Sequence, residues 1–335
     1  MPAGGKIEGR FVRTVRSDIR PEDVGFTHCH EHTFILPGPS CQVNPELLLD
    51  NLEKTTAELA DYYAAGGRSV VDAQPIGPER APRMQRLASE RSGVHIVATT
   101  GFHRAIYYPS GHFRFREPAE KLAERMIAEI TTGMAEYSDS GAVGRISNPS
   151  HAATQTDVRA GLLKMASDYH LIDAQAEKAA EAVAIAHLQT GAPILTHTEF
   201  GTCALEQIRL FKRLGVAASA LLLSHLDRNP DPILHEEIAD AGAYLIYDGI
   251  SRVKCHPDST IVGLITRLTE AGHARRILLG MDMGRRSMWR SYGGGPGMTY
   301  LADTFLRKLR MAGMGNEQVA MFTEYNPAAA LSFRR

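Results

Sequence analysis

The sequence predicts a single α/β domain folded as a (β/α)8 TIM barrel. Eight short apolar or β-branched segments alternate with amphipathic helical segments along the 335 residues, and strict strand–helix alternation produces a parallel sheet. Eight such repeats over this length fit a closed barrel. The alternative is an open doubly wound sheet, but the first strand is not followed by a glycine-rich phosphate turn. We expect one domain over residues 1–335, with residues 1–23 as an N-terminal extension leading into the first strand.

The expected elements follow in order along the chain. The predicted strands are residues 24–32, 69–74, 95–101, 160–166, 193–198, 220–226, 244–250 and 277–283. The predicted helices are residues 45–65, 118–134, 171–190, 205–214, 232–241 and 260–271, with glycines marking several of their ends. Two loops are unusually long, residues 102–117 and 138–159. The first follows a strand, so we expect it on the catalytic face, whereas the second precedes one.

Composition limits the classes of function. The formal net charge is −1, which argues against general nucleic-acid binding because that requires a basic face. The four cysteines include no CxxC pair, so a disulfide framework is not expected and a reducing cytoplasm fits. The N-terminus lacks an apolar signal core, and no segment approaches the length of a membrane span. We therefore expect a soluble, cytoplasmic protein with a small-molecule substrate and neither a nucleic-acid nor a membrane partner.

Side chains that bind metals stand at the ends of five predicted strands. They are His30 and His32, Lys164, His197, His225 and Asp282. An unpaired polar group at the end of a buried strand is costly, and convergence on a metal removes that cost. Active sites of these barrels form at the C-terminal ends of the strands. The pattern predicts a hydrolase with a binuclear metal centre.

Alternation along the first strand places His28, His30 and His32 on one face and Cys29 and Glu31 on the other. The last two histidines stand at the C-terminal end of this strand, where both can reach one cation. His28 lies a layer deeper, and we interpret it as a hydrogen-bonded core histidine.

Lys164 needs a separate explanation because an ammonium group cannot ligate a metal. Carboxylation by carbon dioxide would convert it into a carbamate, an anionic ligand with two oxygens that can bridge two cations. The alternative is an ion pair with Asp282 or Asp248. The surrounding histidines favour the bridging carbamate.

The ordered motifs G-x-T-x-x-HEH, AGLLK, THT, SHLDR and GMD resemble the phosphotriesterase-like branch of the amidohydrolase superfamily, from about Gly25 to Pro327. The resemblance implies two divalent ions per chain, with zinc first and manganese or cobalt as alternatives. It also implies a homodimer, as is frequent among relatives. By the same resemblance, the more buried metal is bound by His30, His32 and Asp282. The more exposed metal is bound by His197 and His225, and carboxylated Lys164 bridges the two metals.

The predicted chemistry follows from the ions. A water bridging two divalent cations loses a proton near neutral pH and becomes a hydroxide nucleophile, while a metal polarises the oxygen of the attacked group. Asp282 can hydrogen-bond that hydroxide and pass its proton to the leaving oxygen.

Cationic residues follow the seventh and eighth predicted strands, where barrels often bind phosphate. Lys254, Arg285 and Arg286 are the candidates for binding an anionic substrate, although Arg286 or Arg252 could instead pair with acids on the rim. Tyr108 on the loop after strand three, with neighbouring His103 and Tyr107, could form the opposite wall.

These residues, with the YGGGPG segment at 292–297, look like the subgroup that hydrolyses phosphorylated sugar lactones. We expect a lactonase acting on a possibly phosphorylated sugar lactone. The alternatives are a phosphotriesterase or carboxylesterase, an amidase acting on an anionic N-acyl compound, and a non-enzymatic metal-binding protein.

Overall fold

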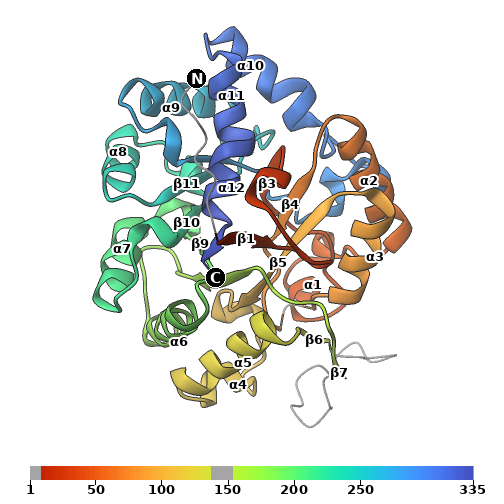
Figure 1. The fold of residues 1–335 in the computed structure, drawn as a ribbon, viewed down its shortest axis with the longest axis vertical. Helices are drawn as coiled ribbons and strands as arrows, with labels where there is room; N and C mark the ends of the chain where they lie inside the picture. The colour runs from red at the N-terminus through yellow and green to blue at the C-terminus, as the bar shows by residue number, and fades with distance from the viewer. Residues whose placement is uncertain (1–8, 78, 137–153, 335) are drawn as a thin grey trace.

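The computed structural model describes residues 9–77, 79–136 and 154–334, and it confirms the predicted barrel (Figure 1). In the eight-stranded sheet, neighbouring strands are parallel, and each strand pairs with the strand that follows it in the sequence of the barrel. The first and last strands of the sheet lie in contact, and just after β12 the Asp282 N–H donates to the His30 carbonyl at 2.9 Å. The strands are β3 (Thr27–Glu31), β4 (Ser69–Asp72), β5 (His95–Gly101), β8 (Leu162–Ala166), β9 (Ile194–His197), β10 (Leu221–Ser224), β11 (Tyr244–Tyr247) and β12 (Ile277–Leu279).

The pleat of the strands determines which side chains face the barrel axis. Leu162, Leu195 and Ile246 belong to the buried cluster inside the barrel. The residues that alternate with them along each strand pack toward the helices. Because side chains alternate, the residues two positions later also face inward at the C-terminal end. Those residues are Lys164, His197 and Asp248. The apolar layer therefore forms a buried floor beneath the polar strand ends.

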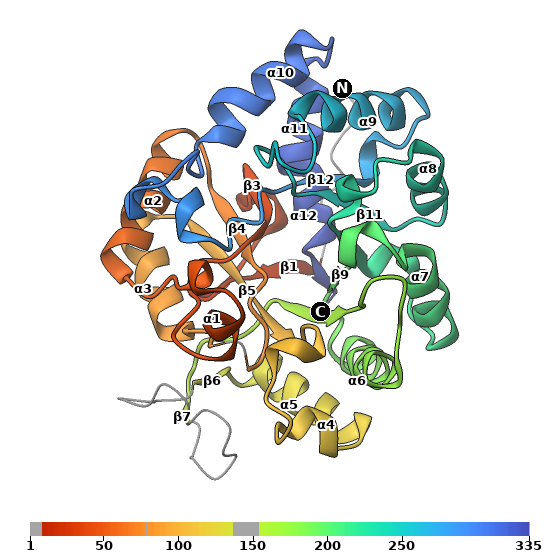
Figure 2. The same ribbon diagram turned by 180° about the vertical axis from the view of Figure 1, so that it is seen from behind.

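Helices surround the barrel, as seen from the other side in Figure 2. All six predicted helical segments are confirmed, with α2 beginning later than predicted. Their bounds are α2 (Leu52–Ala64), α5 (Ala119–Thr131), α6 (Ala174–Thr190), α7 (Ala204–Arg213), α8 (Pro232–Asp240) and α9 (Asp258–Glu270). Helix α6 shows typical termini, since the Asp173 side chain accepts a hydrogen bond from Ala176 N at 2.8 Å and Gly191 ends the helix at φ 73°.

Several helices were not predicted. One is α3, which buries small or polar residues such as Gln85, Ala88 and Ser89 and so lacks an apolar stripe. The others are short segments, and π-helical turns at 301–305 and 321–325 interrupt the C-terminal ones. The bounds of the unpredicted helices are α1 (Pro39–Val43), α3 (Pro82–Ser92), α4 (Phe113–Arg116), α10 (Leu306–Met311), α11 (Asn316–Ala320) and α12 (Asn326–Ala330).

The predicted N-terminal extension contains strands that cover the N-terminal end of the barrel. Strand β1 (Arg10–Arg13) pairs with β2 (Asp18–Ile19) and with β13 (Phe333–Arg334) near the C-terminus, and it crosses the barrel in Figure 1. The Phe11 and Phe333 rings stack at 4.9 Å. The Val15 N–H donates to Ile96 O near the start of β5 at 2.9 Å. This end of the barrel is closed, so access to the interior is from the opposite end.

The second long predicted loop, residues 138–159, lies largely outside the described residues. Where the chain is described again, β7 (Thr154–Gln155) pairs with β6 (Ala135–Glu136). None of the helices in the described ranges is both long and apolar enough to cross a bilayer.

Candidate metal centre

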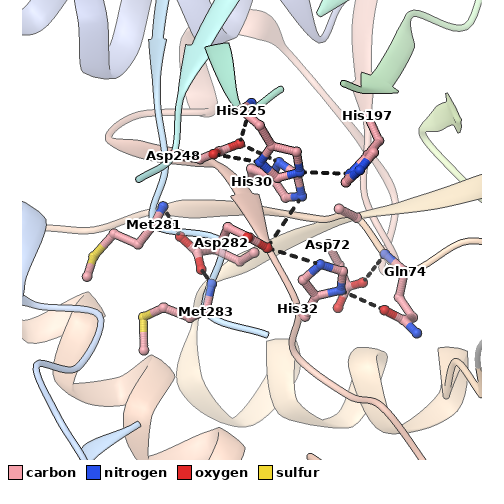
Figure 3. A network of polar contacts seen from close by, with 12 residues as sticks. His30, His32, Asp72, Gln74, His197, His225, Asp248, Met281, Asp282 and Met283 are labelled. Atoms are coloured by element: carbon pink, nitrogen blue, oxygen red, sulfur yellow. Dashed lines mark hydrogen bonds and ion pairs between the residues drawn. The ribbon is translucent and has the colours of Figure 1, made fainter. Parts of the chain in front are cut away.

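Histidines from three strands converge at the C-terminal end of the barrel (Figure 3). His225 Nε2 lies 2.9 Å from His197 Nδ1, and the rings of His30 and His225 are 4.9 Å apart. Asp282 Oδ1 lies 3.4 Å from His32 Nε2 and 3.8 Å from His30 Nε2. Buried imidazole nitrogens and a carboxylate oxygen that face one another in this way fit the ligand shell of divalent cations. The structure thus brings together the four predicted histidines and Asp282.

A β-bulge in β3 corrects the strict alternation expected for its side chains. The register with β4 shifts between His28 and Glu31, which breaks the two-residue period of the strand. The His28 and Glu31 side chains therefore contact each other, with 2.8 Å between Nδ1 and Oε1, and Cys29 faces the barrel interior. The placement of His28 with His30 on one face is wrong. The interpretation of His28 as a buried, hydrogen-bonded core histidine is confirmed.

The Glu31 carboxylate uses both of its oxygens to place the segment that follows β12. Glu31 accepts hydrogen bonds from Met281 N at 2.9 Å and Met283 N at 2.8 Å. These two residues flank Asp282, whose backbone has a positive φ of 48°. A non-glycine residue in this conformation is strained, and such strain is typical of functional sites. The bulge residue therefore fixes the strained segment that presents Asp282.

Each histidine of the cluster has a polar partner on the side away from the centre. Asp248 lies 2.8 Å from His30 Nδ1 and 2.7 Å from His225 Nδ1. The other pairs are His32 Nδ1 with Gln74 Oε1 at 2.6 Å and His197 Nε2 with Glu199 Oε2 at 2.7 Å. Such contacts fix the tautomer and orientation of a metal-binding histidine. The sequence did not identify these orienting roles of Gln74, Glu199 and Asp248.

Two of the histidines, His197 and His225, are held in the neutral form that can ligate a metal. Burial, which the Glu199 carboxylate opposes, lowers the pKa of His197 to about 4. Burial and the nearby Arg228 hold the pKa of His225 well below its usual value. Burial alone would raise the pKa of Asp248, but His225 and His30 lower it, so this group remains a carboxylate. The neutral imidazoles of His197 and His225, with the carboxylate of Asp248 nearby, suit a cation.

Lys164 lies fully buried in the middle of β8. Its Nζ donates to the Ala73 carbonyl at 2.6 Å. The alternative ion pair is not observed, since neither Asp282 nor Asp248, both described, forms a salt bridge with it. Burial lowers the pKa of the amine to about 8, although Asp282 and Asp72 oppose this shift. A larger fraction of neutral amine favours reaction with carbon dioxide, so the environment fits a carbamate.

Two arginines that the sequence did not assign to the centre hold Asp282. Arg228 and Arg252 each donate to Asp282 Oδ2, at 2.7 Å and 2.8 Å. Burial would raise the pKa of Asp282, but Arg252 and the histidines hold it well below its usual value. The carboxylate is therefore anionic, and Oδ1 faces the histidines. Arg252 thus pairs with an acid, as the alternative interpretation allowed.

A cavity of about 300 Å³ opens over the histidines. Arg285 and Lys254 line it, as predicted for substrate-binding residues. His103 and Tyr107, two of the three wall candidates, also line it. Tyr108 does not, and its buried hydroxyl accepts from His103 N at 2.8 Å and donates to Ile76 O at 2.8 Å. The prediction of Tyr108 itself as a wall residue is therefore wrong, whereas its neighbours His103 and Tyr107 do form this wall. Arg286 also lies outside this lining, on the short turn at 286–288.

The charges in the cavity divide into paired and unpaired groups. Arg104 pairs with Asp168 at 2.5 Å and with Glu199 at 2.8 Å, and Arg228 and Arg252 share the Asp282 carboxylate as their ion-pair partner. Among the residues that the structure describes, no carboxylate pairs with Arg285 or Lys254. The wall formed by the loops after β11 and β12 thus carries free positive charge.

A family model with the description "Phosphotriesterase family" matches residues 10–331. The chain belongs to the phosphotriesterase family. The predicted family and the predicted hydrolytic enzyme are thereby confirmed. A relative from Mycoplasmopsis synoviae, named phospho-furanose lactonase, is 32% identical over 98% of this chain and 93% of its own length.

Solved structures of this family share the fold. A lactonase from Listeria monocytogenes has a TM-score of 0.87 at 31% identity and covers 97% of this chain and 100% of its own. The phosphotriesterase homology protein from Escherichia coli, solved with phosphate in its active site, has a TM-score of 0.82 at 28% identity. It covers 92% of this chain and 99% of its own.

Proposed function

We propose that this enzyme is a binuclear metal-dependent lactonase that opens a phosphorylated sugar lactone. The observation that carries the proposal is the charge arrangement in the cavity. Three arginines next to the histidines form ion pairs with acids, whereas Arg285 and Lys254 have no carboxylate partner among the described residues. Unpaired cations that line a cavity favour an anionic group on the substrate.

The residues that would hold the metals are those predicted from the sequence. His30, His32 and Asp282 would hold one cation, His197 and His225 the other, and carboxylated Lys164 would bridge them. Zinc is the first candidate, and manganese or cobalt also suits histidine, carboxylate and carbamate ligands. When bound, such cations supply Lewis-acid polarisation and lower the pKa of water.

Asp282 is the group placed to hold and move a proton. Its Oδ1 faces the histidine cluster, so it is positioned to accept a proton from the attacking water and to deliver it to the leaving oxygen. Arg228 and Arg252 fix the carboxylate through Oδ2. The unpaired cations Arg285 and Lys254 would orient the lactone by its phosphate.

Two relatives support an anionic substrate. The Mycoplasmopsis synoviae relative is named phospho-furanose lactonase, and the Escherichia coli relative was solved with phosphate in its active site. A relative from Danio rerio, 26% identical, is named N-acetyltaurine hydrolase. Its name keeps the amidase acting on an anionic N-acyl compound as the second candidate, since that substrate would use the same free cations.

A panel of sugar lactones with and without a terminal phosphate, assayed with metal-replete enzyme, tests the proposal. A charge-assisted hydrogen bond contributes roughly 1.5–3 kcal/mol, so two of them should favour the phosphorylated lactone in kcat/KM by about a hundredfold or more. The variant Arg285→Ala should lose most of this preference and retain its metal. Arg286→Ala, a neighbouring arginine outside the cavity lining, is the matched control and should keep the preference.

Equal hydrolysis of neutral and phosphorylated lactones would contradict the anion-binding role. Hydrolysis of N-acyl amino sulfonates in preference to every lactone would favour the amidase. Neutral phosphotriesters and carboxyl esters belong in the same panel. The homodimer and the cytoplasmic location stay predictions, and light scattering of the purified protein tests the first.

A further inference from the structure

A second cavity, of about 600 Å³, lies next to the metal cavity and is formed by the loops after β8, β9 and β10. Its lining is Tyr169, His170, Phe200, Thr202, Arg228 and Asn229. Phe200 and Arg228 also line the metal cavity, so the two spaces are contiguous. The volume is within the usual range for small-molecule sites, about 300–1,000 Å³. We call this space the aromatic cleft.

Phe200 is held at the boundary between the two cavities in a strained conformation. Its backbone is left-handed at φ 53° and ψ 35°, and Cys203 is also left-handed at φ 62°. Gly201, at φ 71°, lets the loop approach Asn229 closely, since an added Cβ would lie 2.7 Å from Asn229 Cβ. A bulky residue in this region costs on the order of 1 kcal/mol or more, and such outliers concentrate at ligand sites.

Hydrogen bonds fix the neighbouring loop against this strained turn. The Thr202 hydroxyl donates to Glu199 O at 2.7 Å and accepts from His170 N at 3.0 Å. His170 is itself left-handed at φ 50°. The loops after β8 and β9 therefore form one connected wall. Phe200 remains 52% exposed and Tyr169 61% exposed, although aromatic side chains gain most from burial.

The side chains of the aromatic cleft suit a neutral polar ligand with an apolar face. The rings of Tyr169 and Phe200 meet edge to face at 6.1 Å and 89°. The Tyr169 hydroxyl, the His170 imidazole and the Asn229 amide have no hydrogen-bond partner among the described residues. The cation of the cleft, Arg228, is already paired with Asp282. Aromatic faces pack on the C–H face of a sugar ring, and free polar groups bind its hydroxyls.

We propose that the aromatic cleft is a second substrate subsite, which binds a neutral polyhydroxylated group such as a sugar ring. The metal cavity has the volume for a small phosphorylated lactone, so the ring in the cleft is a further unit attached to the end remote from the phosphate. The assignment of this ring to the substrate rests on the lactonase function proposed above. The binding of a sugar ring to the cleft does not depend on that function.

Saturation-transfer NMR with methyl β-D-glucopyranoside, a neutral sugar, tests the subsite on the metal-replete enzyme. The ring C–H protons should receive saturation from the wild-type protein, also in the presence of saturating inorganic phosphate. Phe200→Ala should reduce the transfer roughly fivefold, and Tyr169→Ala offers a second variant at an exposed position. Tyr325→Ala removes a tyrosine that is equally exposed, at 61%, in the C-terminal segment, and should leave the transfer unchanged.

Absence of transfer, or equal transfer with wild type and both cleft variants, would overturn the subsite. Loss of transfer on addition of phosphate would place the sugar in the metal cavity and would overturn it as well. Because the measurement needs no turnover, it is independent of the lactone panel. If the enzyme hydrolysed none of the lactones in that panel but still bound the sugar, the proposed lactonase function would be wrong and the proposed binding site would stand.

Discussion

Replacement of Asp248 by asparagine tests how one buried carboxylate supports both metal positions. Oδ1 of Asp248 lies 2.7 Å from His225 Nδ1, and Oδ2 lies 2.8 Å from His30 Nδ1. His30 and His225 belong to different halves of the proposed centre. Asparagine has nearly the same shape, but it offers one oxygen and one N–H donor group. Whichever way the amide is oriented, one histidine N–H faces a donor.

The structure gives the size of the effect. A hydrogen bond to a charged group contributes roughly 1.5–3 kcal/mol, and Asp248 is fully buried, so water cannot replace the lost acceptor. The affected metal position should therefore bind its cation about 10- to 150-fold more weakly. This agrees with the roughly 10- to 100-fold effect of removing outer partners of metal ligands.

Metal content measured by mass spectrometry across a series of chelator-buffered concentrations gives the affinities. Glu129→Gln is the matched control, because Glu129 is also a buried carboxylate and pairs with Arg80 away from the centre. That variant should be less stable but should bind metal as the wild type does. Wild-type affinity at both positions in Asp248→Asn would refute the orienting role.

Three further predictions concern the proton shuttle, the loop after β12 and the dependence of stability on pH. Asp282→Asn should lower kcat about a hundredfold or more in metal-replete protein; turnover like that of the wild type would exclude Asp282 as the proton shuttle. Buried Glu58 accepts from Ser291 N at 2.8 Å and Met298 N at 2.9 Å, so Glu58→Gln should loosen the loop after β12 and speed amide exchange there, whereas exposed Glu53→Gln should not. Burial, which Ser40 opposes, raises the pKa of Glu79 to about 8 from 4.5. The folded state therefore holds this proton more tightly, and stability falls as pH rises from about 4.5 to about 8. Thermal unfolding should show Glu79→Gln gaining Tm over wild type at pH 8 but not below pH 4.5, and a gain equal at both pH values would contradict the shift.

The strand ends were predictable because each combines an apolar segment with a polar terminus that a buried barrel would otherwise exclude. The structure confirms all eight strands, although pairing covers fewer residues than the apolar segments suggest. In β3 the bulge at His28–Glu31 ends the simple alternation. A bulge depends on the register with the neighbouring strand, and one sequence does not reveal that register.

Pairings between distant loops were the part that the sequence could not provide. Arg104 meets Asp168 across 64 positions, and Arg228 meets Asp282 across 54. Which arginine is neutralised, and which remains free for an anion, depends on such contacts. Glu199, two residues after His197, could have been suspected from proximity alone. Tyr107 and Tyr108 differ by one step of a 3-10 turn, and that step decides which side chain reaches the cavity.

Titration of metal-free enzyme with zinc in the presence of bicarbonate tests the central claim most directly, with hydrolysis of a phosphorylated sugar lactone as the readout. Activity should rise from zero and level off at about two equivalents per chain, because the ligand set forms two positions bridged by carboxylated Lys164. A Lys164→Ala variant should not regain activity in the same titration. Activity in metal-free enzyme, or a plateau at one equivalent with unmodified Lys164, would contradict the account.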